Sequence, residues 1–265
     1  MSYQPLVSIV TVVFNGEKHL VQTIESVLGQ TYPHIEYVII DGGSSDGSVG
    51  IIKSYQHKIS YWISEKDKGI SDAFNKGIAK CNGEIIGIIN ADDWYEKDAV
   101  VRVVNAISNY DVAYGDLSYW KDGKKEMTVK GNHDLMKNEM TLNHPTVFVK
   151  KHCYTKWGLF SLNYKYAMDY DFLIRVLKNH GTFVYVPGVL ANMRWEGLSD
   201  TYWKKACEEL LDIKEKYFPE RKFMHRLYFY KQVSAIRLSR FLNKIGFHPI
   251  VKFYRSRFSP VEKTF

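Results

Sequence analysis

Apolar and polar positions alternate along the first 110 residues between two periods, one typical of buried strands and the other of amphipathic helices. Four strands are predicted by apolar runs, at residues 7–14, 35–41, 59–64 and 83–90. A helix is predicted after each of the first three strands, at residues 16–30, 48–56 and 70–80. This alternation predicts an α/β domain built around a mostly parallel sheet.

The second half of the chain has a less regular pattern. Three further strands are predicted, the first two joined by a hairpin, at residues 111–120, 124–131 and 182–194. A helix is predicted over residues 167–181, with Gly181 as its stop signal. We place one domain over residues 1–205 and a basic, aromatic, helical extension over residues 206–265.

Polar residues stand at the ends of the first four predicted strands, at Asn15, Asp41, Glu65 and Asp92. Ligand sites of open α/β sheets lie beyond the carboxyl ends of the strands, so these four loops are expected to converge on one crevice. Asp92 is followed by Asp93, and adjacent carboxylates repel each other. Two interpretations follow: a divalent cation shared with a diphosphate offsets the charges, or the pair forms the N-cap of a helix just downstream.

Composition fits one globular domain, since 45% of the residues are hydrophobic and 25% are charged. The formal net charge is +7, but its distribution is uneven. Ten of the 36 Lys and Arg residues and none of the 29 Asp and Glu residues lie between Arg221 and Arg257, which leaves 26 basic against 29 acidic residues elsewhere. The basicity therefore belongs to the tail.

Three features predict a cytoplasmic protein. Cys81, Cys153 and Cys207 match neither a disulfide framework nor a zinc motif, so we expect reduced thiols. The longest apolar run, residues 6–14, is too short to span a bilayer. It also lacks the preceding basic segment and the following cleavage site of a secretory signal.

Apolar residues recur at helical spacing in the tail, with basic residues beside them. This apolar stripe consists of Phe223, Leu227, Tyr230, Leu238, Phe241 and Ile245. Two interpretations fit it: an amphipathic helix on an anionic membrane surface, at the inner face of the cell membrane, or a helix packed on the main domain with its charges in water. Nucleic acid is not expected as a partner, because no recognition motif accompanies the charge.

Five segments, in this order and spacing, resemble inverting family 2 glycosyltransferases. They are VSIVTVVFN at 7–15, IEYVIIDGGSSDGS at 35–48, DKGISDAFNKG at 67–77, GEIIGIINADDW at 83–94 and MDYDFLIR at 168–175. The likeness covers roughly the first 200 residues, and several motifs in order are more specific than any one of them. It implies a GT-A fold, an α/β sandwich that binds a nucleotide sugar.

The resemblance also implies a reaction and a set of donor-binding residues. The reaction is the metal-dependent transfer of a hexose, with inversion, from a nucleotide sugar (UDP sugars favoured) to a hydroxyl of a polysaccharide or lipid-linked glycan. The positions that match donor-binding motifs are Val12, Phe14, Asn15, Asp41, Glu65, Asp67, Lys68, Asn75, Asn90, Ala91 and Asp92. Phe14 is open to a second interpretation as a core residue, Asp41 as an anchor of the glycine-rich turn, and Lys68 as a solvated lysine.

The metal-binding triplet of the family falls on Asn90, Ala91 and Asp92, so an amide replaces its first carboxylate. Asp92 is therefore the favoured ligand for Mg²⁺ or Mn²⁺. Asp93 is either a further ligand, a holder of a bound water or only a helix cap. One reliable carboxylate is compatible with Mg²⁺, which keeps several waters and takes oxygens from substrate phosphates.

Asp169 matches the family's general base, at the start of the helix predicted around it. Met168 replaces the glutamate that precedes this base in relatives, and Asp171 is the competing candidate. On the acceptor side the resemblance points to His144, and to the segment Arg194–Ser199 with Trp195. In that segment Glu196 replaces a glycine of relatives.

Two other functions compete with this prediction. A nucleotidyltransferase that makes sugar nucleotides lacks support, because no glycine-rich, arginine-containing loop occurs near the N-terminus. A catalytically silent nucleotide-sugar binder, or an assembly partner, remains the alternative, because the family's carboxylates are absent at Asn90 and Met168.

Overall fold

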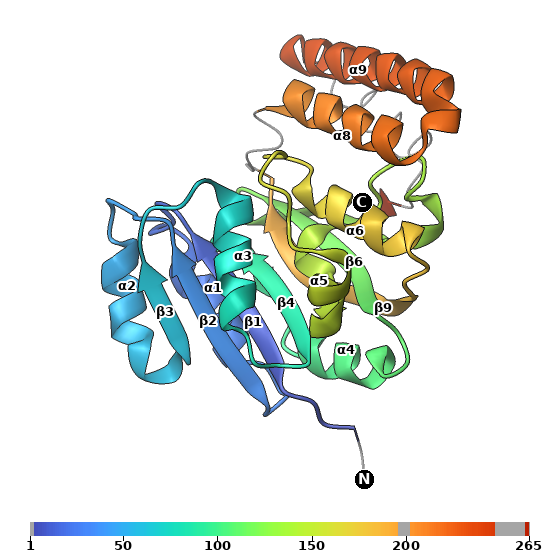
Figure 1. Ribbon diagram of the computed structural model, residues 1–265. Coiled ribbons are helices and arrows are strands. Elements are labelled where there is room, and N and C mark those ends of the chain that lie inside the picture. Colours follow the sequence, from blue (N-terminus) through green and yellow to red (C-terminus); the bar gives the residue numbers. More distant parts are fainter. Residues whose placement is uncertain (1–2, 196–201, 247–262, 265) are drawn as a thin grey trace.

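A single mixed sheet forms the centre of the computed structural model, which describes residues 3–195, 202–246 and 263–264 (Figure 1). Its strands are β1 (Val7–Val13), β2 (Ile35–Asp41), β3 (Tyr61–Ser64), β4 (Ile85–Asn90), β5 (Trp94–Tyr95), β6 (Val112–Lys121), β7 (Lys124–Val129), β8 (Phe148–Lys150), β9 (Phe183–Arg194) and β10 (Lys263–Thr264). The main path runs β10-β7-β6-β8-β4-β1-β2-β3, with β9 beside β6 and β5 beside β9.

The parallel part of the sheet consists of β3, β2, β1 and β4. β8 joins β4 in the antiparallel sense and leads to β6, whose long ladder with β9 is parallel. β6 and β7 form the predicted hairpin, with Asp122 and Gly123 at positive φ in the turn. The mostly parallel sheet expected from the sequence is therefore confirmed for the first half of the chain.

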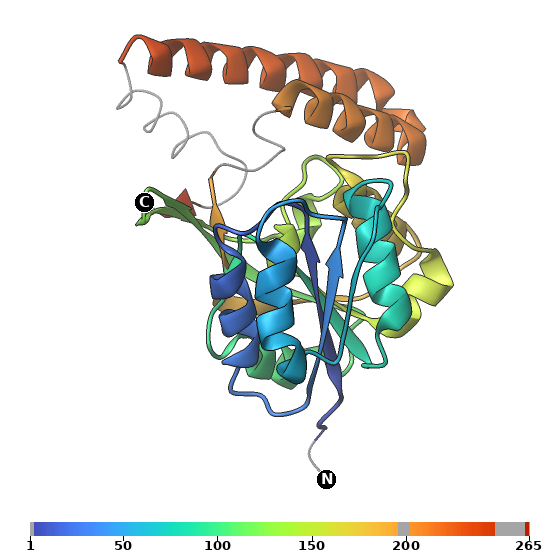
Figure 2. The same cartoon turned by 90° about the vertical axis from the view of Figure 1, so that its left-hand side faces the viewer.

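Helices cover both faces of the sheet (Figures 1 and 2). One face carries α1 (Leu20–Leu28), α2 (Ser48–Tyr55) and α4 (Ala99–Ile107), and the other carries α3 (Ile70–Lys80), α5 (Lys151–Trp157) and α6 (Met168–Lys178). Successive residues of a strand point to opposite faces, so Ile9 belongs to one hydrophobic core and Val10 to the other. Burial on both faces explains why these strands are continuous apolar runs.

Two C-terminal helices, α8 (Trp203–Tyr217) and α9 (Lys222–Lys244), form a pair at one end of the molecule, with α9 packed on α8 (Figures 1 and 2). α8 is tied to the main domain by Glu209, which accepts hydrogen bonds from the backbone N–H groups of residues 165–167. Because α8 begins at Trp203, the predicted boundary at residue 205 falls inside a helix, and the division of the chain stays a prediction.

Two local predictions were wrong. The helix after β4 begins only at Ala99, with Asp98 as its N-cap residue, because Trp94 and Tyr95 pair with β9 instead. Asp92 and Asp93 therefore do not cap a helix. α6 ends before Gly181: His180 adopts the left-handed conformation, and the N–H of Gly181 bonds to the carbonyl of Val176.

Gly77 allows α3 to approach the sheet closely. A Cβ at this position would lie 2.3 Å from Cγ1 of Val10 on β1. By contrast, a Cβ at Gly50, which is exposed on α2, would meet no atom within 4 Å. Substitution of Gly77 therefore tests packing, and substitution of Gly50 tests helix propensity.

We expect Gly77→Ala to lower the free energy of unfolding by about 1–3 kcal/mol, because the added methyl overpacks the α3–β1 contact. Gly50→Ala should raise it by about 0.5–1 kcal/mol, because alanine has the higher helix propensity. Urea denaturation of both variants measures the difference. Equal effects of the two substitutions would contradict a packing role for Gly77.

Candidate functional site

The carboxyl ends of the parallel strands lie side by side, as the sequence predicted. Val12 of β1 is in register with Asn90 of β4, and Val13 of β1 with Asp41 of β2. Asp41 in turn is in register with Ser64 of β3, directly before Glu65. The loops that follow β1, β2, β3 and β4 thus meet at one edge of the sheet.

The turn after β2 is anchored by Asp41, which is fully buried. Its carboxylate accepts hydrogen bonds from the N–H groups of Gly43 (3.1 Å) and Ser44 (3.0 Å), and from the hydroxyls of Ser44 and Ser64. The structure therefore gives Asp41 the anchoring role, while a direct contact with a nucleoside stays a prediction.

The loop after β1 is joined to this turn. Asn15 has a φ of 51°, a left-handed conformation that asparagine tolerates. Its side-chain oxygen accepts from the N–H of Ser45 (2.9 Å), and its own N–H donates to Ser44 Oγ (2.8 Å). Phe14 is 68% exposed, so the interpretation of it as a core residue is wrong. Its ring is available to a ligand above β1 and β2.

The loop after β3 adds charged groups at the same edge. Glu65 forms an ion pair with Lys76 (2.8 Å), and Asp67 accepts from the N–H of Gly69 (2.8 Å). Lys68 is exposed at the start of α3. Asn75 is different, because its amide nitrogen donates to the carbonyl of Phe160 and its amide oxygen accepts from the N–H of Phe160, both at 2.9 Å. Through these two hydrogen bonds the Asn75 side chain joins α3 to the loop before α6.

Thr23 holds the loop after β4. It belongs to α1, on the face of the sheet opposite to α3. The buried Thr23 hydroxyl lies 2.9 Å from the carbonyl oxygen of Ala91 and 2.6 Å from that of Asp93. Asp93 is 1% exposed, and Nδ2 of Asn90 donates to its carboxylate at 3.3 Å. Burial and the neighbouring Asp92 raise the pKa of Asp93 well above its usual range. The pair is thus asymmetric: Asp93 is enclosed and Asp92 is half-buried.

The oxygen atoms of this loop fit a divalent cation. Oδ1 of Asn90 and Oδ1 of Asp93 are buried without a hydrogen-bond partner. Among the residues that the structure describes, the Asp92 carboxylate likewise accepts no hydrogen bond. Carboxylate and amide oxygens are the ligands that Mg²⁺ and Mn²⁺ prefer. The donor set therefore matches the predicted metal, and Asp92 is the accessible carboxylate of the set.

Arg194, at the end of β9, contacts the same loop. It donates to the carbonyl oxygen of Asp92 and to the side-chain oxygen of Gln22 on α1, and its guanidinium lies 4.6 Å from the ring centre of Trp94. A positive charge is thereby placed next to the two carboxylates. Trp195 packs edge-on against Tyr119, with ring centres 5.0 Å apart.

The two aspartates at the start of α6 have different surroundings. Asp171 is 1% exposed and forms ion pairs with Arg175 (3.1 Å) and Lys216 (3.3 Å), besides a hydrogen bond from Tyr217 (3.0 Å). These contacts give it a structural role. Asp169 has no ion-pair partner among the described residues. Burial, with a smaller contribution from Glu209, raises the pKa of Asp169 to about 7, which suits a proton acceptor.

Tyr119 on β6 lies beside the site, although no motif in the sequence singled it out. Burial raises its pKa to about 12, and the charges of Asp93 and Asp169 contribute to the increase. Its neighbour Ser118 is in register with Asn192 of β9, which pairs with Trp94 directly after the loop that follows β4. The Tyr119 hydroxyl donates to Oδ1 of Asn143 (3.2 Å). The place of Tyr119 close to the hairpin was the one sign in the sequence that this side chain lies near the surface.

His144 belongs to the interior of the α3 side. Its ring stacks on Phe74, with ring centres 4.8 Å apart, and burial lowers its pKa to about 4. It is therefore neutral, and the hydrogen-bonding or acceptor role proposed for it stays a prediction. Residues 196–199 of the predicted closing segment lie outside the described residues.

A second cluster of metal-ligating groups, Asp111, His152 and Cys153, lies elsewhere. Asp111 precedes β6, and its carboxylate already accepts from Thr182 and His152. This cluster is next to the amino end of β4, where Lys151 bonds to Glu84, and so at the other end of the strand from Asp92. Burial raises the pKa of Cys153 to about 12, which disfavours a thiolate ligand.

Comparison with known proteins agrees with the fold described above. The family model for glycosyl transferase family 2 matches residues 8–187. An uncharacterized glycosyltransferase of Rickettsia typhi is 30% identical over 192 residues, which cover 67% of this chain and 60% of the relative. The chain thus spans less than two thirds of that relative's length.

Two solved structures share the GT-A fold at low identity. The mannosyltransferase PcManGT of Pyrobaculum calidifontis, in complex with GDP-Man and Mn²⁺, has a TM-score of 0.65 and 16% identity, over 86% of this chain and 70% of that one. TarS of S. aureus (residues 1–349), in complex with UDP-GlcNAc, has a TM-score of 0.60 and 18% identity, over 78% of this chain and 66% of that one.

The raised pKa of Asp169 predicts a pH-dependent effect on stability. Between the usual pKa of an aspartate, about 4, and the folded value of about 7, the folded state holds a proton that the unfolded state has lost. The free energy of unfolding should therefore fall as pH rises through this window. We expect Asp169→Asn to raise the melting temperature at pH 8 and to change it far less at about pH 4, where the unfolded state also holds the proton about half of the time.

Asp171→Asn is the matched control, because it breaks a buried ion pair. It should lower the free energy of unfolding by about 3–5 kcal/mol. Calorimetric melting of both variants at the two pH values provides the measurement. A loss of stability in Asp169→Asn at pH 8 would contradict the raised pKa.

Proposed function

The chain belongs to glycosyl transferase family 2, and from this premise we propose that it transfers a hexose from a nucleotide sugar to a hydroxyl of a polysaccharide or lipid-linked glycan, with inversion. A UDP sugar is the favoured donor, in line with the UDP-GlcNAc complex of TarS. The observation that carries the proposal is the set of oxygen atoms left without hydrogen-bond partners on the loop after β4, at the edge where the parallel strands end. Asp169 is the proposed proton acceptor for the sugar held there.

The donor lies along the carboxyl edge of the parallel strands. The exposed ring of Phe14 stacks on the base, and the turn anchored by Asp41 holds the nucleoside. Val12 and Asn15 shape the floor, while Glu65, Asp67 and Lys68 form the rim on the α3 side. Lys68 contributes a point charge toward the diphosphate.

The diphosphate end of the donor lies at the loop after β4. Asp92, with Asn90 and Asp93 behind it, would hold a Mg²⁺ or Mn²⁺ ion. When bound, that ion supplies positive charge to the departing diphosphate. Ala91, fixed by Thr23, keeps the loop backbone in place, and Arg194 adds a second positive charge beside the loop.

Asp169 removes the proton of the acceptor hydroxyl as that oxygen attacks the anomeric carbon. Its carboxylate has no counter-ion among the described residues and has a pKa of about 7, so it is basic enough to accept a proton near neutral pH. The bond to the diphosphate oxygen breaks on the opposite face of the sugar, which gives inversion. Asp171 holds α6 in place through its contacts with Arg175, Lys216 and Tyr217.

The alternative is a catalytically silent nucleotide-sugar binder. Asn90 and Met168 stand where the family has carboxylates, and both departures remain in the structure. The raised pKa of Asp169 favours the enzyme. A carboxylate that only caps a helix has its charged form stabilised by N–H groups, which would lower its pKa instead.

We expect Asp169→Asn to lower kcat at least about 100-fold while donor binding persists, because only the proton acceptor is lost. In the native chain, kcat/KM should rise as pH increases through about 7, where Asp169 loses its proton. A panel of UDP and GDP sugars with Mg²⁺ or Mn²⁺ tests transfer, and calorimetry tests binding.

Two controls accompany this assay. A chelator should abolish transfer, and Lys53→Gln, an exposed change on α2, should leave it intact. Full activity of Asp169→Asn would assign the base elsewhere. Donor binding without transfer by the native chain would favour the silent binder.

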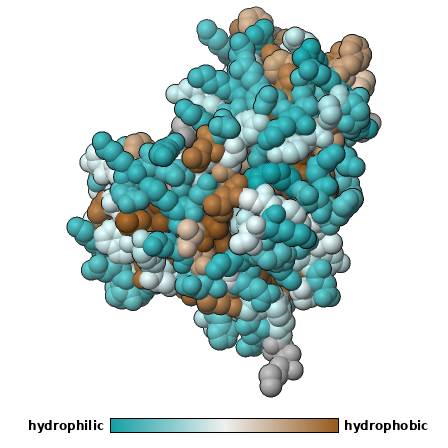
Figure 3. All heavy atoms as spheres, in the orientation of Figure 1, coloured by the Kyte–Doolittle hydropathy of each residue, from teal (hydrophilic) through white to brown (hydrophobic). Residues whose placement is uncertain are grey.

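The chain also has a surface suited to a peripheral membrane protein, and this is a second part of the proposal. No helix among the described residues is long and apolar enough to cross a membrane. α9, however, exposes the apolar stripe defined above: Phe223 is 78%, Tyr230 66% and Phe241 59% exposed. The stripe lies opposite the face that packs on α8 through His225 and Val233. Figure 3 shows apolar side chains at this end of the molecule.

Charge on α9 favours an anionic lipid surface as the partner of the stripe. The helix contains no Asp or Glu, and Arg226, Arg237, Arg240 and Lys244 are exposed along it. Each basic residue adds about 1 kcal/mol near such a surface. A helix that only packs on the protein would not expose its apolar side, so the exposed stripe supports a membrane surface as its partner. We therefore propose the inner face of the cell membrane as the location.

Leu227→Ser with Phe241→Ser should weaken binding to vesicles that contain phosphatidylglycerol at least about tenfold, because each buried side chain contributes about 1.5–3 kcal/mol. Leu162→Ser, an equally exposed apolar residue of the main domain, is the control and should have no effect. Flotation and co-sedimentation with phosphatidylcholine vesicles test the role of charge. Loss of self-association, with lipid binding unchanged, would assign the stripe to a second copy.

A further inference from the structure

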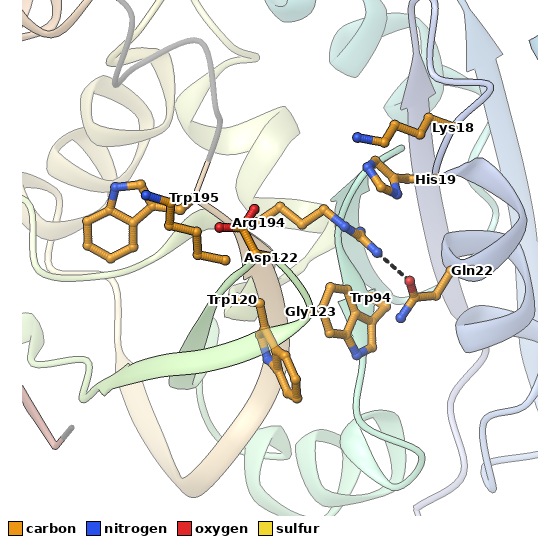
Figure 4. A pocket seen from close by; sticks show the side chains of 10 residues that line it. Lys18, His19, Gln22, Trp94, Trp120, Asp122, Gly123, Arg194 and Trp195 are labelled. Atoms are coloured by element: carbon orange, nitrogen blue, oxygen red, sulfur yellow. Dashed lines mark hydrogen bonds between the residues drawn. The ribbon is translucent and has the colours of Figure 1, made fainter.

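A pocket of about 440 Å³ opens beside the loop after β4, between α1 and the β6–β7 hairpin (Figure 4). Its volume is within the range of about 300–1,000 Å³ that is typical of ligand sites. None of the donor-binding residues proposed above lines it. The pocket is therefore a separate space that adjoins the diphosphate end of the donor.

Three indole rings line the pocket, those of Trp94, Trp120 and Trp195. The first two are 5.5 Å apart between ring centres, and the third packs edge-on against Tyr119. Trp120 is fixed, because its Nε1–H donates to Oδ1 of Asn192 at 2.7 Å, and Asn192 is itself 1% exposed. Rigid indole faces offer flat apolar surface to the C–H groups of a sugar ring with little loss of side-chain entropy.

Positive charge surrounds these rings. Lys18 and Lys121 are exposed at two sides of the pocket, and the Arg194 guanidinium reaches across it toward Gln22 (Figure 4). Asp122 is the one carboxylate among the described residues of the lining. Aromatic faces combined with an excess of cations suit a sugar that carries a carboxylate or a phosphate.

The position of the pocket relates it to transfer. Arg194 links it directly to the loop after β4, because the same guanidinium donates to the carbonyl of Asp92. The Tyr119–Trp195 contact extends it along β6, where the Tyr119 hydroxyl donates to Asn143. A glycan held on the indoles would thus extend past Arg194 toward the loop that holds Asp92.

We propose that this pocket binds an acidic saccharide unit of the acceptor, one or more sugars away from the hydroxyl that is glycosylated. The assignment to the acceptor rests on the proposed glycosyl transfer, whereas the binding of an acidic saccharide rests on the pocket alone. Trp120 supplies the stacking surface, and Lys18 and Lys121 attract the anionic group. Arg194 forms the end of the pocket that faces the donor.

Fluorescence titration of the full chain tests binding, since tryptophans line the pocket. The acidic probes are trigalacturonate and a hyaluronan tetrasaccharide, and the neutral probes are cellotriose and chitotriose. At least one acidic probe should quench the fluorescence with an affinity about tenfold above that of the neutral probes, which corresponds to about 1.4 kcal/mol. This preference should decline with added salt.

Variants locate the site. Trp120→Ala should weaken binding of the acidic probe about tenfold. The double variant Lys18→Gln with Lys121→Gln should have the same effect, and it leaves the fold intact because both lysines are exposed. Trp62→Phe on β3 and Lys53→Gln on α2 are matched controls outside the pocket and should change nothing. Calorimetry with UDP and GDP sugars and Mg²⁺ should give the same donor affinity for the lysine variant as for the native chain.

The possible outcomes separate this inference from the proposed function. Equal binding of acidic and neutral probes, or binding unaffected by both sets of pocket variants, would overturn it. A loss of donor affinity in the lysine variant, as large as its loss of saccharide affinity, would also overturn it and assign the pocket to the nucleotide. Saccharide binding by a chain that binds no nucleotide sugar would support the pocket while rejecting the proposed donor.

Discussion

The site depends on how the short loop after β4 is held. The Thr23 hydroxyl lies within hydrogen-bond distance of two of its carbonyl oxygens, and Asp93 is enclosed beneath it and bonded to Asn90. Arg194 at the end of β9 donates to the carbonyl oxygen of Asp92. These contacts join α1, β4 and the end of β9, three elements far apart in the chain. Because Asp93 is enclosed, Asp92 is the member of the pair that is turned toward solvent, and the position of Arg194 follows from the same contacts.

Function at this site opposes stability. Burial raises the pKa of both Asp93 and Asp169, which means that their charged forms are disfavoured in the fold. A domain of this size tolerates that cost because its sheet is covered on both faces and its parallel strands are largely apolar and buried. Of the buried side-chain atoms without a hydrogen-bond partner among the described residues, those of Asn90, Asp93 and Tyr95 lie in or just after the loop that follows β4. Such a distribution is expected when unsatisfied groups are kept for a ligand.

The C-terminal pair α8 and α9 extends this arrangement. α8 is joined to the main domain where α6 begins, through Glu209 to residues 165–167 and through Lys216 and Tyr217 to Asp171. α9 then packs on α8 with one face and exposes its apolar stripe with the other. The helix that carries Asp169 therefore connects, through α8, to the surface proposed to meet the membrane. An acceptor presented at a lipid surface would arrive on the side of the molecule that holds Asp169, the proposed proton acceptor.

Much of the fold was predictable from residues close together in the chain. The apolar runs at 35–41 and 70–80 coincide with β2 and α3, because burial on both faces of a strand or on one face of a helix leaves a local pattern. The motifs also placed Asn90, Asp92 and Asp169 at element ends. Errors arose where a distant partner decided the local structure: Trp94 and Tyr95 pair with β9, which delays α4 and removes the cap role of Asp92 and Asp93.

By itself, then, the sequence determined the alternation of strands and helices in the first 90 residues, the edge on which the polar strand ends meet, and the amphipathic character of the tail. Tertiary structure alone decided which of two neighbouring carboxylates is free: Asp171 rather than Asp169 meets Arg175 and Lys216, and Asp93 rather than Asp92 is enclosed. It also brought Tyr119 to the site, gathered three tryptophans around one pocket and left the α9 stripe exposed. The physical reason is that burial and charge pairing depend on atoms contributed by remote segments, and the spacing of residues along one segment carries no record of them.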